Sequence, residues 1–142
     1  MLKLLIAVDG SEHARRAIQA IARLAQETGP MEVLLVHVTG NLPLKVNPAM
    51  WVGHLQENAV RSHQWQVLEK AVHLAHENGL VDCKTEATSG MVAQAIVRVA
   101  TQAGVDQIVM GTRGLKAQRN HSLGSVAHQV LQLASIPVLL VT

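Results

Sequence analysis

Short apolar runs alternate with helical patterns along the whole sequence, and this alternation constrains the fold more than any other feature. Leu4–Val8 is a continuous apolar run of the kind that forms a strand buried on both faces, and Val33–Val38 and Ile108–Met110 repeat the pattern. Val138–Val141 is a further apolar run, opened by Pro137. These four runs predict buried strands of a parallel sheet.

The intervening segments carry helix signals. Helices are predicted at about 11–28, 55–78, 92–103 and 125–134. Ser11 can cap the first helix and Gly29 closes it, while Gly79 ends the second. Residues 40–58 are the least regular part of the sequence and predict a surface loop that leads into the second helix at about residue 55.

Residues 81–88 alternate in polarity and predict a strand with one wet face or a place at the sheet edge. Val81, Cys83, Thr85 and Ala87 would share one side of it, and Asp82, Lys84 and Glu86 the other. Strands and helices then alternate without repeats or linkers over residues 1–142, which predicts one doubly wound α/β domain with helices on both faces of a parallel sheet. In such sheets ligands bind beyond the carboxyl ends of the strands.

Composition narrows the function classes. The net charge is +2, and neither a basic run nor an aromatic platform supports nucleic-acid binding. Cys83 is the only cysteine, so no intrachain disulfide is possible. No apolar stretch approaches the ~18 residues of a membrane span. We therefore expect a cytoplasmic protein without nucleic-acid or membrane partners.

The loop after the Ile108–Met110 strand carries the chemistry. It reads Gly111-Thr112-Arg113-Gly114, then nine residues, then Gly124-Ser125 at a helix start. Glycines let the backbone approach a bulky anion, and free N–H groups at a helix start favour phosphate. Positive charges that could neutralise phosphate lie nearby, at Arg113, Lys116 and Arg119.

This loop resembles the ATP-binding signature of the universal stress protein family, Gly-x-x-Gly, nine residues, Gly-Ser. The resemblance extends along essentially the whole chain, through Asp9 after the first strand, Val-His-Val ending the second, and Ile-Pro-Val-Leu-Leu-Val at residues 136–141. It implies a universal stress protein domain over residues 1–142. It also implies an adenine nucleotide alpha hydrolase-like fold, with a five-stranded parallel sheet in the order 3-2-1-4-5.

The resemblance also implies roles for individual residues. Asp9 and the backbone of Ala7 and Val8 would contact adenosine, and Val38 would bond adenine through its main chain. The residues that would line the ribose and hold the phosphates are Met110, Gly111, Gly114, Gly124, Ser125 and Val126. ATP would be the ligand, with Mg²⁺ or Mn²⁺ bridging its phosphates and no metal ligand from protein side chains. The sequence departs from the family pattern at Gly90-Met91-Val92, which lacks a proline, and at Asn120-His121-Ser122, where the family is apolar.

Plainer readings stand beside these. The glycines could be turn residues, and Asp9 could merely cap the first helix. His73 and His76 share a helix face without an evident third metal ligand. His37 is expected to be a hydrogen-bonded core histidine, His121 a solvated loop residue, and Cys83 an inert thiol.

The apolar strand formed by Val138, Leu139, Leu140 and Val141 should lie at the sheet edge, and an exposed apolar edge invites pairing. In the resembled family this strand makes homodimers. Three functions follow as hypotheses: a nucleotide-dependent stress-response dimer, a slow ATPase or phosphotransferase, and a ligand-free dimeric scaffold. The sequence has no Walker-type P-loop, which disfavours rapid phosphoryl transfer.

Overall fold

The computed structural model describes residues 1–40, 53–114 and 123–142, and of residues 53–58 the backbone alone. Its elements run β1 (Leu2–Ala7), α1 (Glu12–Thr28), β2 (Met31–Thr39), α2 (Gly53–Glu77), β3 (Cys83–Ser89), α3 (Val92–Ala103), β4 (Gln107–Gly111), α4 (Ser125–Leu133) and β5 (Val138–Val141). All pairings are parallel, in the order β3-β2-β1-β4-β5. The predicted fold class is confirmed.

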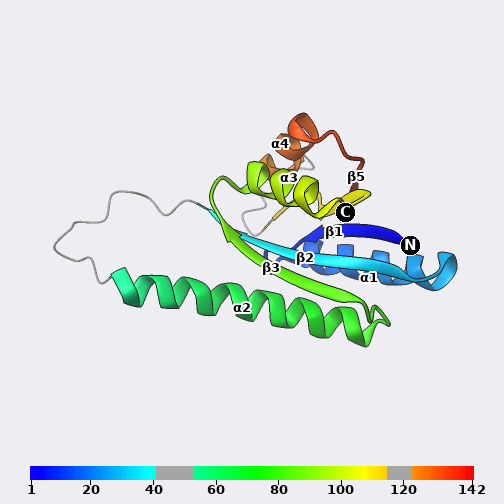
Figure 1. Ribbon diagram of the computed structural model, residues 1–142, viewed down its shortest axis with the longest axis horizontal. Coiled ribbons are helices and arrows are strands. Elements are labelled where there is room, and N and C mark those ends of the chain that lie inside the picture. The colour runs from blue at the N-terminus through cyan, green and yellow to red at the C-terminus, as the bar shows by residue number, and fades with distance from the viewer. Residues whose placement is uncertain (41–52, 115–122) are drawn as a thin grey trace.

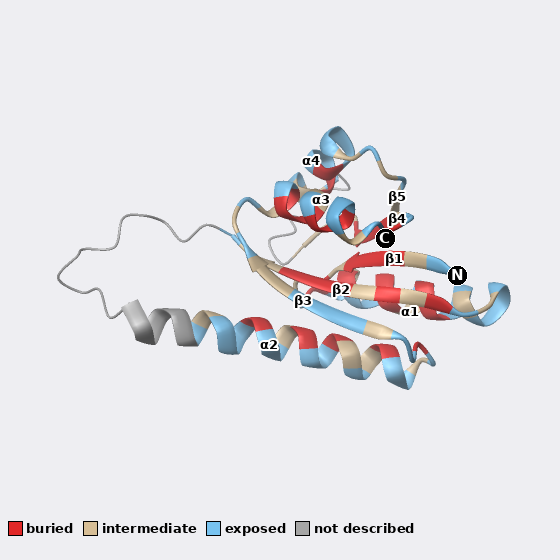
Figure 2. Ribbon diagram, viewed as in Figure 1, coloured by how far each residue is buried: buried red, intermediate tan, exposed pale blue. Residues whose placement is uncertain are grey.

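Four strands, β1, β2, β4 and β5, alternate their side chains between two cores, whereas the edge strand β3 contributes to one of them. Leu4 and Ile6 of β1 face the core beneath α1 and α2, whereas Leu5 faces the core beneath α3 and α4. All three are fully buried, and each contributes roughly 1.5–3 kcal/mol of hydrophobic stabilisation. Figures 1 and 2 show the helices on the two sides of the sheet, with their buried residues turned toward it.

The ends of the first two helices follow local chemistry. Ser11 is the N-cap of α1, and its hydroxyl accepts the N–H of Ala14 at 3.2 Å. Gly29 ends α1 with a φ of +106°, a conformation that favours glycine. Gly79 does the same after α2, with a φ of +93°. The caps predicted from the sequence are confirmed.

The start of β3 differs from the prediction. The sequence predicts that this strand begins at Val81, but Val81 is 86% exposed and precedes the first paired residue, Cys83. After the turn at Gly79, Leu80 fills the core instead, and the Asp82 carbonyl accepts the N–H of Val33 at 2.9 Å. The turn therefore places Leu80 in the core and leaves Val81 exposed before β3 begins at Cys83. As predicted, β3 and β5 are the sheet edges.

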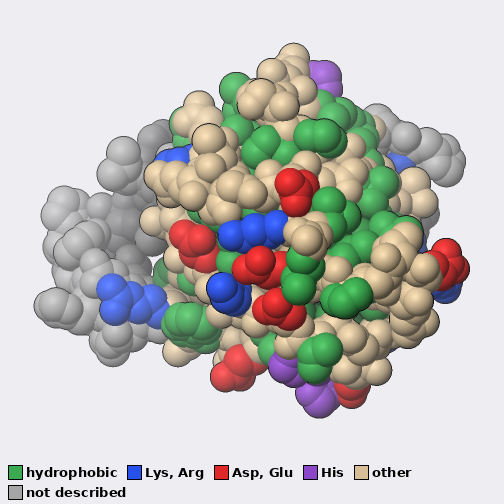
Figure 3. Space-filling view, turned by 45° about the vertical axis from the view of Figure 1, so that its right-hand side comes forward, with side chains coloured by type: hydrophobic (Ala, Val, Ile, Leu, Met, Phe, Trp, Pro, Cys, Tyr) green, Lys and Arg blue, Asp and Glu red, His purple; other side chains and the backbone are tan. Residues whose placement is uncertain are grey.

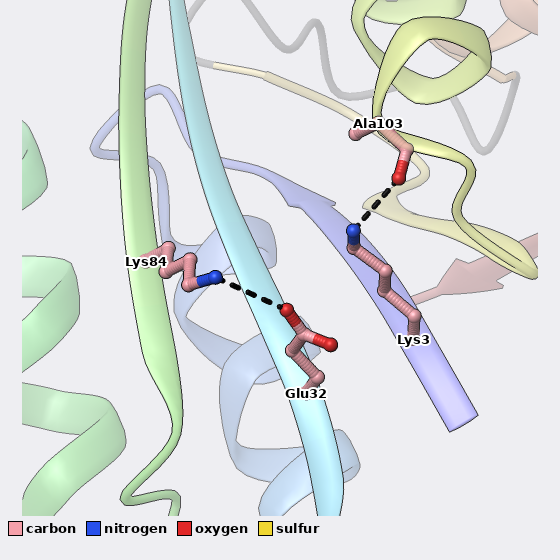
Figure 4. A network of polar contacts seen from close by, with 4 residues as sticks. All are labelled: Lys3, Glu32, Lys84 and Ala103. Carbon is pink, nitrogen blue, oxygen red and sulfur yellow. Dashed lines mark hydrogen bonds and ion pairs between the residues drawn. The ribbon is translucent and has the colours of Figure 1, made fainter. Parts of the chain in front are cut away.

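Charged side chains are satisfied internally where the strands begin. Lys3 of β1 donates its Nζ to the Ala103 carbonyl at 2.7 Å, and Lys84 of β3 lies 3.4 Å from Glu32 of β2 (Figure 4). Figure 3 shows Lys and Arg side chains interleaved with Asp and Glu side chains on the face that it presents. These contacts lie at the amino ends of the strands, whereas ligands of parallel α/β sheets bind at the opposite, carboxyl ends.

No helix within the described ranges is both long enough and apolar enough to cross a membrane.

Candidate nucleotide site

The strand order creates a crevice where β1 meets β4. These two strands pair directly, with Ile6 opposite Val109, yet the chain leaves β1 for α1 on one face and leaves β4 for α4 on the other. Two diverging connections open a crevice at the carboxyl ends of the strands. Asp9 lies in the first connection and Gly111–Gly114 begins the second.

Asp9 connects these two segments. Its Oδ1 accepts the N–H of Ser11 at 2.9 Å, so Asp9 supports the cap of α1 while Ser11 is the cap itself. Its other oxygen, Oδ2, lies beside Gly114, where an added Cβ would stand only 2.6 Å away. The proposed capping role of Asp9 is thus present in part, and it uses only one of the two carboxylate oxygens.

The other two signature glycines also make close approaches. A Cβ on Gly111 would stand 2.5 Å from the Cβ of His13 in α1, and one on Gly124 would stand 2.9 Å from the carbonyl of Thr112. All three glycines have negative φ or extended backbone, so space rather than dihedral freedom demands them here. Each glycine of the motif is therefore required by a close contact with another part of the chain.

Backbone bonds bring the start of α4 to the glycine turn. The Gly124 N–H donates to the Thr112 carbonyl at 2.7 Å, and the Thr112 N–H donates to Val141 of β5 at 3.0 Å. Gly124 is the N-cap of α4 and has no side chain with which to cap the first turn. The N–H groups of the first turn lack intrahelical partners and carry the positive end of the helix dipole. Ser125 is exposed beside them.

Val38 presents main-chain groups toward the same crevice. Val8 donates its N–H to the Val36 carbonyl at 2.8 Å, so the main-chain groups of Val36 face β1. Residues two apart in a strand present these groups to the same side, so those of Val38 face that way too. The last β1–β2 pair is Ala7 with Val36, and the N–H and C=O of Val38 therefore lie beyond the end of β1.

The remaining predicted site residues differ in how much of each is available to a ligand. Val8 has its N–H committed to Val36, and the Met110 side chain is buried in the core beneath α3 and α4. Val126 packs against that same core. Arg113 lies beside Gly124, whereas Lys116 and Arg119, like His121, fall outside the described residues.

His13 is a neighbour of the site that sequence reasoning missed. Its ring Nδ1 lies 3.4 Å from the Thr112 hydroxyl, which joins α1 to the glycine turn. Ninety-nine positions separate the two residues, and His13 lies outside the glycine motif to which Thr112 belongs. The only available signal was the place of His13 in the first turn of α1, immediately after the crossover from β1.

His37 corrects an expectation. It is buried, as predicted for a core histidine, but its Nδ1 has no hydrogen-bond partner among the described residues. Burial, and then repulsion from His63, lowers the pKa of His37, while Asp9 acts in the opposite direction. The imidazole is therefore neutral at pH 7.

Other expectations concern the outer side of α2 and β3. His73 pairs with Glu77 at 2.8 Å on the exposed face of α2, and no group of three potential metal ligands occurs within the described ranges. Burial and the adjacent Asp82 raise the pKa of Cys83, which favours the unreactive thiol form.

A groove of about 430 Å³ lies between α2 and β3, lined by Trp65, Leu68, Glu69, Val72, His73, His76 and Thr85. None of the proposed nucleotide-binding residues lines this groove.

Comparison with known proteins gives a consistent result. The model of the universal stress protein family matches residues 1–142. The universal stress protein YxiE of Bacillus subtilis is 33% identical over 98% of this chain and 97% of its own. Among solved structures, UspA of Lactobacillus plantarum superposes with a TM-score of 0.83 at 22% identity, covering 99% of this chain and 97% of that one. An Arabidopsis thaliana universal stress protein with AMP bound has a TM-score of 0.71 at 22% identity, covering 99% and 91%.

Proposed function

The chain belongs to the universal stress protein family, and we propose that it is a stress-response module that binds an adenine nucleotide, with ATP as its ligand, in the crevice between β1 and β4. The observation that carries the proposal is the meeting of Asp9 with Gly114. A carboxylate oxygen that faces a glycine turn is suited to accept hydrogen bonds from hydroxyl or amino groups.

The crevice offers a complementary group for each part of a nucleotide. Asp9 would take the ribose hydroxyls, and the free main-chain groups of Val38 would take the polar edge of adenine. The uncapped first turn of α4, with the Ser125 hydroxyl, would hold phosphate, and Arg113 would add positive charge. A protein with the same fold has AMP bound, which supports an adenine nucleotide as the ligand.

The ATP form of the proposal includes a divalent ion. Mg²⁺ usually keeps several waters and binds through substrate phosphates, so it does not require a protein cage. This agrees with the chemistry of the described part of the crevice, where Asp9 is the carboxylate at hand and is engaged with Ser11. Mg²⁺ or Mn²⁺ would therefore enter with the phosphates of ATP.

We also propose that the protein is a cytoplasmic homodimer formed through β5, and that residues 1–142 make a single domain. Thr112 and Ile108 of the β4 segment bond the carbonyls of Val141 and Pro137. By strand alternation, the main-chain groups of Val138 and Leu140 face away from β4. This open edge can pair with the same edge of a second copy.

The test of the nucleotide site is calorimetric titration of AMP and ATP into wild type and Asp9→Asn, with phosphate release followed in parallel. Asparagine keeps an oxygen for the Ser11 N–H but removes the charge. We expect affinity to fall about tenfold, as for the loss of one hydrogen bond to a charged group. Asp106→Asn is the matched control, because Asp106 likewise accepts a backbone N–H, from Lys3, at the opposite edge of the sheet. Failure of the wild-type protein to bind either nucleotide would refute the proposal, and multiple turnovers per minute would make it an enzyme instead.

A further inference from the structure

Two buried polar atoms at the carboxyl end of β2 lack partners. His37 is only 6% exposed. Among the described residues, neither its Nδ1 nor the Oγ1 of Thr39 has a hydrogen-bond partner. Buried polar groups in proteins are nearly always hydrogen-bonded, and an unsatisfied one is costly. Two of them on one strand end therefore call for a partner that the described part of the chain does not supply.

The two atoms are neighbours in space. Residues two apart in a strand point to the same face, so His37 and Thr39 both face the side covered by α1 and α2. They flank Val38, whose main-chain groups lie past the end of β1. Hence the end of β2 carries the main-chain donor and acceptor of Val38, past the last β1–β2 pair, between two side-chain atoms that have no partner among the described residues.

The neighbouring side chains pack against His37, but among the described residues none forms a hydrogen bond with its Nδ1. The His63 ring of α2 packs against it edge to face, with centroids 6.0 Å apart and an interplanar angle of 81°. Gln64, the buried residue that follows His63 in α2, donates its Nε2 to the Thr88 carbonyl at 2.8 Å. Asp9, whose carboxylate marks the crevice, is close enough to act electrostatically on His37. The histidine therefore lies between α2 and the proposed site.

We propose that His37 and Thr39 bind the polar edge of the adenine base and determine the preference for adenine, an inference that rests on the proposed nucleotide site. A neutral imidazole offers one donor and one acceptor nitrogen, and a hydroxyl both donates and accepts. Adenine presents an amino donor beside a ring-nitrogen acceptor, whereas hypoxanthine presents an oxo group in place of the amino group. The Val38 main chain holds the base, and the two side chains read the edge that distinguishes these purines.

The test combines unfolding of the free protein with nucleotide binding. Thr39→Val and His37→Leu remove the unpartnered atoms while filling similar space, and His37→Asn restores a polar atom near the Nδ1 position. Without ligand, Thr39→Val should unfold a few degrees higher than wild type, because an unsatisfied buried group is removed. Its affinity for AMP should fall about tenfold, as for the loss of one hydrogen bond. Thr85→Val, at an exposed position of β3, is the matched control and should change neither.

Comparison of AMP with IMP tests the specificity. Wild type should bind AMP at least about tenfold more tightly than IMP, His37→Leu should lose most of this preference, and His37→Asn should regain part of it. If wild type binds AMP and both Thr39→Val and His37→Leu bind it equally well, with the same preference over IMP, the inference is wrong and the nucleotide site stands. If wild type binds neither nucleotide, both fail. A lower unfolding temperature in Thr39→Val with unchanged affinity would assign Thr39 a structural role and would also overturn the inference.

Discussion

The carboxylate of Asp9 and the α-carbon of Gly114 meet so closely that any side chain at position 114 would collide with Oδ2, since even a Cβ would stand 2.6 Å away. The two residues lie 105 positions apart and belong to different crossovers. The contact makes the glycine turn and the acidic residue parts of one structure. Testable consequences follow for this contact and for three others.

Gly114→Ala should weaken AMP binding strongly while leaving the fold nearly intact. The clashing atom is the end of a side chain that can rotate, so the cost to unfolding should stay below about 1 kcal/mol. Rotation of Asp9, however, would turn Oδ2 out of the crevice. The measurement is a double-mutant cycle for AMP affinity with Asp9→Ala. Equal losses from Gly114→Ala in both backgrounds would show that the two residues act independently.

Gly111→Ala should instead destabilise the fold. Its Cβ would stand 2.5 Å from the Cβ of His13 and 3.0 Å from the His13 backbone carbon, so α1 itself must shift. We expect a loss of about 1–3 kcal/mol in urea unfolding, typical of overpacking. Gly40→Ala is the control, because its Cβ would make an ordinary 3.7 Å contact with Val92. Similar stabilities for the two variants would contradict the packing role of Gly111.

His37 should make stability depend on pH near neutrality. Its pKa in the folded protein lies below the ordinary value of 6.5, so the unfolded chain takes up the proton first as pH falls. Stability should be fully present above about pH 6.5 and should decrease as pH falls toward the lower pKa of the folded state. Thermal unfolding from about pH 7.5 to 5.5 should show a decline that is smaller in His37→Asn.

The exposed His76→Asn variant controls for the loss of a histidine as such, and its pH profile should match wild type. His63→Ala removes one cause of the lowered pKa of His37, and should make the decline shallower. A decline of the same size in wild type and His37→Asn would mean that other groups control stability in this range.

Leu140→Pro should convert the proposed dimer into a monomer. Proline removes an N–H that faces away from β4, which is tolerated at a sheet edge but blocks pairing with a second copy. Leu140→Ala loses comparable packing against the core beneath α3 and α4 and keeps the N–H, so it should remain dimeric. Sedimentation velocity measures the difference. If Leu140→Pro folds and still dimerises like wild type, the interface lies elsewhere.

Most of the architecture could be predicted because burial and backbone chemistry act over short windows. Leu4–Val8 and Val138–Val141 are apolar runs with few alternatives to a strand, and Ser11 and Gly29 carry cap signals that need no tertiary context. The edge position of β5 followed from the strand order. The predicted start of β3 at Val81 was wrong. Alternation of apolar residues does not reveal that Leu80, in the turn after Gly79, is buried in the core while Val81 is exposed.

The candidate site was predictable in outline and not in detail. The spacing from Gly111 to Ser125 marked the loop, but the reason for each glycine is a contact with His13, Asp9 or Thr112, and only Asp9 had been singled out. His37 was expected to find a hydrogen bond in the core, and its Nδ1 finds none among the described residues. Burial can be estimated from a strand pattern, whereas hydrogen-bond partners depend on what packs above the strand.

By itself, the sequence determined which segments become strands and helices and, to within one residue, where β1, β2 and β4 end, at Ala7, Thr39 and Gly111. Those outcomes follow from side-chain periodicity and local backbone preference. Only the tertiary structure decided that Asp9 faces Gly114, that Gly124 bonds Thr112, and that the Nδ1 of His37 and the Oγ1 of Thr39 find no partner within the described ranges. These relationships arise from the strand order and from close approaches between distant segments, which no local pattern encodes.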